Sequence, residues 1–81
     1  MMGVISKVAL NTTFWTQLAS GPCAVTFNPT DTIDYVIHNA TTQPTVTKGL
    51  VALRDIDKSM SLIAGDVLFA KGNGSLILDV S

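Results

Sequence analysis

The sequence predicts an all-β protein, a small antiparallel β-sandwich or barrel of about seven short strands. Stretches in which apolar and polar side chains alternate recur along the chain, as they do in strands with one buried face. Glycine, proline and asparagine separate these stretches at intervals of about ten residues, which is typical of sandwiches and barrels. The 81 residues are expected to form one β domain, residues 1–81. A jelly-roll-like and an immunoglobulin-like strand order both fit this pattern.

The clearest strand pattern lies near the C-terminal end of the chain. Two apolar runs, Val67–Ala70 and Leu76–Val80, flank a Gly-Asn-Gly-Ser cluster whose residues tolerate positive φ. This arrangement predicts a β-hairpin with a longer loop. Within the second run Leu76, Leu78 and Val80 share one face of the strand, and this face is expected to be buried in the core.

The N-terminal part predicts one strand followed by a less regular segment. Val4–Leu10 alternates and is predicted to be a strand with one apolar face. Within residues 12–22, Phe14, Trp15 and Leu18 share a helical face, so either one helical turn or an irregular connection ends there at a Gly-Pro pair. Trp15, the largest apolar side chain, is expected to plug one end of the core.

Four further strands and their turns complete the predicted fold. Asn28–Asp31 is a type I turn sequence with proline at its second position. Asn39–Pro44 is predicted to be a polar loop, and Gly49 is predicted to bend or bulge the strand that follows it. The strands are expected over Cys23–Phe27, Thr32–His38, Thr45–Arg54 and Met60–Ile63.

The composition favours self-association. Charged residues make up 14% of the chain, against about 25% in an average soluble protein, and ten threonines supply much of the polar surface. Threonine favours strands, but a surface poor in charge is also easily dehydrated, as the centre of an interface must be. So small a core is marginally stable, and the single cysteine excludes an internal disulfide. Oligomerisation is the expected source of further stability.

The charge pattern argues against nucleic acid and membrane partners. The formal net charge is −1, whereas nucleic-acid-binding proteins normally carry a basic stripe. The basic residues are scattered: Lys7, Lys48, Arg54, Lys58 and Lys71. The sequence contains neither an apolar run as long as a membrane span nor the pattern of a signal peptide, so synthesis in the host cytoplasm is expected.

Candidate catalytic residues are few. His38, the single histidine, follows Asp34 by four residues on the same face of a predicted strand. The two residues are therefore roughly 13 Å apart along the strand, too far for a hydrogen bond. Cys23 is expected to be a small buried hydrophobic residue. Asp55 and Asp57 resemble the start of a calcium-binding loop, but the glycine and glutamate that such a loop requires are missing. The sequence thus predicts a protein that is not an enzyme, with no catalytic, metal-binding or cofactor-binding residue and no cofactor.

Two stretches resemble short virion proteins of bacteriophages. They are Trp15–Cys23, with its Trp-x-x-Leu-x-x-Gly element, and Gly65–Leu78, in which Gly-x-x-Leu-x-Ala-x-Gly leads into a terminal strand. The resemblance implies a compact β domain that decorates a capsid or contributes to a tail or head fibre, as one of many symmetric copies, and a trimer is the assembly expected for it.

The resemblance and the composition together favour a capsid decoration or cement protein. Such a subunit would reside in the virion and bind the major capsid protein or another virion protein. A tail, adaptor or fibre component is the alternative. A further alternative is a module that binds a host surface or a carbohydrate through Trp15 and Tyr35.

Overall fold

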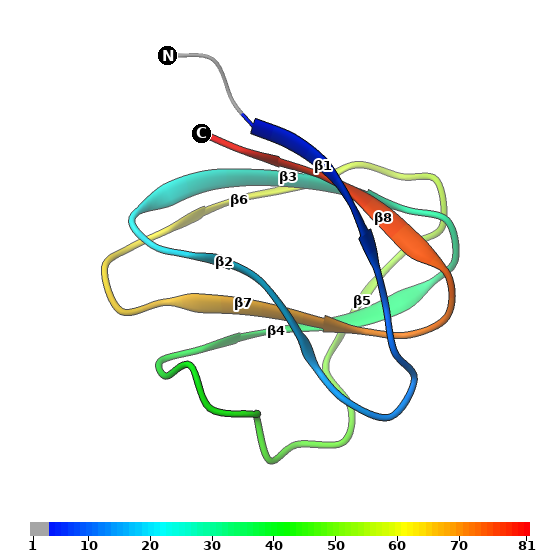
Figure 1. Cartoon of the computed structure of the whole chain (residues 1–81), viewed down its shortest axis with the longest axis horizontal. Helices are drawn as coiled ribbons and strands as arrows, with labels where there is room; N and C mark the ends of the chain where they lie inside the picture. The colour runs from blue at the N-terminus through cyan, green and yellow to red at the C-terminus, as the bar shows by residue number, and fades with distance from the viewer. Residues whose placement is uncertain (1–3) are drawn as a thin grey trace.

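The computed structural model describes residues 4–81, and all eight elements in this range are β-strands (Figure 1). The prediction of an all-β sandwich is confirmed, with eight strands in place of about seven. Within the described residues, no helix is long and apolar enough to cross a membrane. The strands are β1 (Val4–Ala9), β2 (Thr16–Ser20), β3 (Cys23–Pro29), β4 (Ile33–His38), β5 (Leu50–Ala52), β6 (Lys58–Leu62), β7 (Val67–Lys71) and β8 (Ser75–Val80).

The strands form two four-stranded antiparallel sheets that pack face to face. Sheet A has the order β1-β8-β3-β6 and sheet B the order β2-β7-β4-β5. The first four strands pair with the last four in reverse order, as β1·β8, β2·β7, β3·β6 and β4·β5. The chain therefore forms one long antiparallel hairpin that is rolled up. Within each sheet, two segments of this hairpin lie side by side and are joined by β3·β8 in sheet A and by β4·β7 in sheet B. This strand order is that of a jelly roll, which decides between the two arrangements that the sequence left open.

The predicted C-terminal hairpin is wrong. β7 and β8 do not pair, because β7 lies in sheet B and β8 in sheet A. The turn between them was correctly placed, and Gly74 in it has φ of 79°. A Cβ at Gly74 would clash with Oγ1 of Thr30. A turn that crosses from one sheet to the other needs the same glycines as a hairpin turn, so the residues indicate the turn and not the pairing.

Two segments depart from the predicted elements. Residues 16–20 form strand β2 where a helical turn or an irregular connection was expected, and a β-bulge lies between Gln17 and Ala19. The inserted residue shifts the strand alternation by one position, which is why the apolar spacing looked helical. The predicted strand Thr45–Arg54 is reduced to Leu50–Ala52. A Cβ at Gly49 would clash with the carbonyl oxygen of Tyr35, so the strand begins just after a close approach of two backbones.

The main core lies between the two sheets. Its side chains come from alternate positions of the strands, as the pleat requires. Phe27 of β3 and Tyr35 of β4 meet edge to face across the sheets, with ring centroids 5.8 Å apart. The prediction that Leu76 and Leu78 face the core is confirmed, since both are buried. The core residues are Ala19, Val25, Phe27, Ile33, Tyr35, Ala52, Leu62, Leu68, Ala70, Leu76 and Leu78.

Trp15 does not plug an end of this core. It is 5% exposed and packs with Val67 and Phe69 in a second apolar cluster, with Val36 at its margin. Successive residues of β7 point to opposite sides of sheet B, so Val67 and Phe69 face away from the main core that contains Leu68. The tryptophan therefore packs on the outer side of sheet B.

The loop of residues 39–49 forms a third layer over this cluster. In Figure 1 the green loop lies on the side of sheet B away from sheet A. The Gln43 side chain pairs with the Trp15 backbone, since Oε1 accepts from the Trp15 N–H (2.9 Å) and Nε2 donates to the Trp15 carbonyl (2.6 Å). The indole Nε1–H donates to the Val46 carbonyl at 2.9 Å. Lys71 Nζ donates to the Thr47 carbonyl at 2.5 Å and lies 4.6 Å from the centroid of the Trp15 ring.

We expect Trp15→Ala to lower the free energy of unfolding by about 3–5 kcal/mol, because it empties the second cluster and removes the anchor of loop 39–49. Urea unfolding followed by circular dichroism measures the change. Phe14→Ala is the matched control: Phe14 is the adjacent aromatic residue but is 63% exposed, so its removal should change stability by no more than about 0.5 kcal/mol. Equal losses of stability in the two variants would contradict the packing of loop 39–49 on Trp15 as a third layer.

Candidate interaction surface

Among residues 4–81, no other segment packs over the outward side of sheet A. Loop 39–49 packs over the outward side of sheet B, whereas no comparable described segment lies over sheet A in Figure 1. We call this side the bare face. The strand registers assign to it Ile5 and Lys7 of β1, Ile77 and Asp79 of β8, Ala24, Thr26 and Asn28 of β3, and Ser59 and Ser61 of β6.

The outward direction of these side chains follows from the alternation along each strand. Thr26 is paired with Asp79 on β8 and with Ser59 on β6, so the three side chains share one side of the sheet. Their neighbours Phe27 and Leu78 are buried between the sheets. The same strands that build the core therefore also build the bare face.

Short polar side chains dominate the bare face. The hydroxyl groups of Thr26 and Ser59 are hydrogen-bonded at 2.8 Å, and Asn28 Nδ2 donates to Asp57 Oδ1 at 2.8 Å. Lys7 and Asp79 are its two charged members. Hydroxyl groups that already have partners lose little when water is removed from them. The face is thus easily dehydrated, like the centre of a protein–protein interface.

The area of the bare face limits what one copy can bind. Four strands at a spacing of about 4.8 Å and about six residues at 3.3 Å each give roughly 19 Å by 20 Å, on the order of 380 Å². A stable interface buries about 800 Å² on each partner. The bare face of a single copy therefore supports a weak contact, and tight binding requires several copies or further surface.

Asp79 is the one side chain in residues 4–81 with a buried polar atom that lacks a hydrogen-bond partner. The atom is Oδ1. Asp79 lies between Ile5 on β1 and Thr26 on β3, and the hydroxyl groups of Thr26 and Ser59 are hydrogen-bonded to each other. Buried carboxylate oxygens normally accept at least one hydrogen bond. The carboxylate is therefore a place where the bare face lacks a donor.

A small hollow lies at the open edge between β5 and β6. It has a volume of about 210 Å³ and is lined by Val51, Ala52, Leu53, Ile56, Asp57 and Lys58. Ligand pockets usually measure about 300–1,000 Å³, so the hollow is small for a cofactor or a drug-sized molecule. Its lining has no titratable group beyond Asp57 and Lys58, and Asp57 also accepts a hydrogen bond from Asn28 of the bare face.

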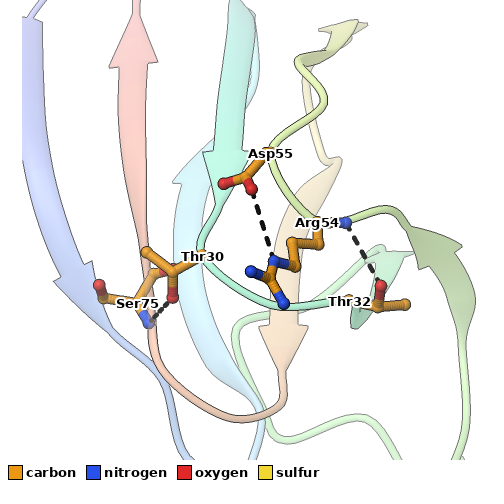
Figure 2. Close-up of polar contacts among 5 residues, drawn as sticks. All are labelled: Thr30, Thr32, Arg54, Asp55 and Ser75. Atoms are coloured by element: carbon orange, nitrogen blue, oxygen red, sulfur yellow. Dashed lines mark hydrogen bonds and ion pairs between the residues drawn. The ribbon is translucent and has the colours of Figure 1, made fainter.

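The loop that borders this hollow is held to neighbouring turns. Figure 2 shows the Arg54 N–H donating to Oγ1 of Thr32 at 3.3 Å, and the ion pair between Arg54 Nε and Asp55 at 3.4 Å. In the same view Oγ1 of Thr30 accepts from the Ser75 N–H at 3.1 Å. The ion pair is exposed and adds little stability. The hydrogen bonds fix this end of the sandwich, so the strands of the bare face are held in register there.

The residues considered for catalysis are not brought together. The His38 ring packs against Phe69, with centroids 6.2 Å apart, on the outer side of sheet B. Cys23 packs against the core between the sheets, and its Sγ–H donates to the Ser20 carbonyl at 3.4 Å. Sheet B therefore separates the two side chains. Asp34 Oδ2 accepts from the Gly49 N–H at 3.3 Å, which gives it a structural contact to loop 39–49.

The aspartates and aromatic residues are also engaged separately. Asp55 pairs with Arg54, while Asp57 accepts from Asn28. Over residues 4–81, no three His, Cys, Asp or Glu side chains are grouped so that they could hold a metal ion. Trp15 and Tyr35 are both buried, so neither ring offers a stacking surface for a sugar.

Comparison of the chain with protein-family models, with curated proteins and with solved structures finds no match. The bare face was not identified from the sequence. The low charge and the many threonines indicated an easily dehydrated surface, but its location depends on which sheet loop 39–49 covers. The exposed, unprotected edge of β1 beside it was likewise not predicted.

Two neighbours on β8 test the assignment of the two sides of sheet A. Leu78 faces the core and is 5% exposed, while Ile77 belongs to the bare face and is 46% exposed. We expect Leu78→Ala to lower the free energy of unfolding by about 2–5 kcal/mol, and Ile77→Ala to lower it by less than about 1 kcal/mol. Urea unfolding of both variants provides the measurement. The opposite ranking would mean that sheet A has the reverse orientation.

Proposed function

We propose that the chain is a non-enzymatic structural protein of a phage virion, a capsid decoration subunit that binds the assembled head lattice through the bare face and stabilises it. The observation that carries this proposal is the difference between the two sheets. One sheet is covered by a loop of the chain itself, and the other presents a surface rich in short polar side chains to the outside. The partner in this proposal is the major capsid protein.

The small area of the bare face suits a partner with many identical sites. A contact on the order of 380 Å² is weak when made once. On a lattice, a ligand with several copies binds its second site at a raised effective concentration, so modest contacts combine into tight attachment. A subunit of this kind is useful on an assembled capsid and has little affinity for an isolated capsid protein.

Rigidity supports the same function. The turns at one end of the sandwich are tied by hydrogen bonds that Thr30 Oγ1 exchanges with the Ser75 backbone and that Thr32 Oγ1 accepts from the Arg54 N–H. Asn11 Oδ1 accepts from the N–H groups of Thr13 and Phe14 in the connection between β1 and β2. A surface that is already ordered loses little conformational entropy when it binds.

The architecture and the sequence resemblance point in the same direction. Jelly rolls are common in viral capsid domains and also occur in lectins, so the fold is compatible with a virion role without specifying it. The buried state of Trp15 and Tyr35 weakens the lectin-like alternative. The resemblance of Trp15–Cys23 and Gly65–Leu78 to phage virion proteins adds to the case for a virion role.

A large charged side chain on the bare face should prevent binding to the capsid. We expect Ser61→Arg to reduce the amount of protein bound to heads, purified from phage that lacks this chain, by at least about tenfold. Thr42→Arg is the control, since Thr42 is an exposed residue of loop 39–49 on the other side of the molecule. Cosedimentation of fluorescent protein with heads measures the binding.

Three results would contradict the proposal. They are no binding of the unmodified chain, equal binding of both variants, and loss of binding in Thr42→Arg alone. Binding of the labelled chain to isolated tails instead of heads would favour the tail, adaptor or fibre alternative.

A further inference from the structure

The free edge of β1 is the longest regular strand edge among the described residues. β1, β6, β2 and β5 are the edge strands of the two sheets. β2 is interrupted by a bulge and β5 has only three residues, and both features protect an edge against pairing. β1 is the longest of the four, with six residues in a regular register. Its residues Val4 and Ile5 are each 70% exposed.

The backbone groups at this edge can be assigned from the pairing with β8. The Leu10 N–H donates to the Gly74 carbonyl, which continues the β1·β8 register. In an antiparallel ladder the bonded positions alternate. Ser6 and Val8 therefore direct their N–H and C=O groups to β8, and Ile5 and Lys7 direct theirs to the free edge.

We propose that a second copy of this chain binds to the free edge of β1, antiparallel and related by a two-fold axis through Ser6. Ile5 then lies opposite Lys7 of the second copy, and the two residues exchange both backbone hydrogen bonds. Val4 lies opposite Val8 of the second copy on the inner side of the sheet. The two sheets A become one sheet of eight strands with both bare faces on the same side.

Charge disfavours one of the alternative registers. A shift that centres the two-fold axis on Lys7 would place the two lysines directly opposite each other, which is unfavourable. With the axis at Ser6, the lysine of the second copy lies beside the apolar side chain of Ile5. An odd shift would place outward residues opposite inward ones and expose the core side of one copy.

The same register supplies the donor that Asp79 lacks. Asp79 is the partner of Ile5 in β8, so Lys7 of the second copy lies two strands from it, at about 9.6 Å between the strand backbones. An extended lysine can cross Ile5 with its aliphatic chain on the isoleucine and its ammonium group at the carboxylate. The Asp79 carboxylate, whose Oδ1 has no partner within residues 4–81, would then accept a charge-assisted hydrogen bond. By symmetry the pair forms twice.

Pairing also doubles the area available to a capsid. Two joined bare faces measure on the order of 760 Å², close to the roughly 800 Å² that one partner contributes to a stable interface. The pairing does not depend on the capsid proposal, because it can be tested with the purified chain alone. The proposed assembly is a dimer, in place of the trimer that the resemblance to virion proteins suggested.

Charge inversion tests the dimer directly. The molar mass of the chain is measured by light scattering over a concentration series that reaches about 1 mM, because contacts of this size are weak. We expect the mass to rise from 8.6 kDa toward twice that value. Lys7→Glu places two carboxylates together and Asp79→Lys places two ammonium groups together. Each variant alone should dimerise at least about tenfold more weakly.

An equimolar mixture of Lys7→Glu and Asp79→Lys should regain the dimer, because both contacts between unlike copies then join opposite charges. Damage to the fold cannot produce this recovery. Lys48→Glu, which inverts an exposed lysine of loop 39–49, should dimerise like the unmodified chain. The proposal is overturned if the unmodified chain stays monomeric or forms trimers, if either variant dimerises normally, or if the mixture stays monomeric.

Discussion

The pairing of the first four strands with the last four in reverse order is the constraint on which the structure depends. It places each strand beside a partner that is distant in sequence, and it alternates successive strands between the sheets except at β4 and β5. The tip of the long hairpin, loop 39–49, is consequently left at sheet B. There it finds Trp15, whose backbone and indole group bind it through Gln43 and Val46.

This placement of one loop makes the two sides of the sandwich different. Sheet B has cores on both sides, and its β7 is accordingly apolar at successive positions from Val67 to Ala70. Sheet A has a core on one side only, and its strands alternate between apolar residues such as Phe27 and polar residues such as Thr26. The difference explains how a domain with few charges has both a sufficient core and a surface suited to binding.

The sequence was sufficient for the fold class and for most strands, but not for their partners. The alternation of apolar and polar residues identified the strands in Val4–Leu10 and Thr32–His38, because no bulge interrupts the alternation of sides in these strands. It failed at β2, where a bulge changes the period. It also failed for the expected hairpin, because the partner of a strand is decided by packing at a distance. The candidate surface was predictable in composition and not in location, since its exposure depends on where Trp15 holds loop 39–49.

The nested pairing also bears on how the chain can fold. Pairing β4 with β5 closes the shortest loop in the hairpin, and it brings β3 and β6 close together for the next step. Each further pair of strands is far apart in sequence, but the pairs formed before it already hold its ends close together, so the entropy cost of closing its loop is small. A topology with mostly distant contacts would otherwise fold slowly. The nested pairing thus allows the strands to pair one after another, from β4·β5 in the middle of the chain to β1·β8 at its ends.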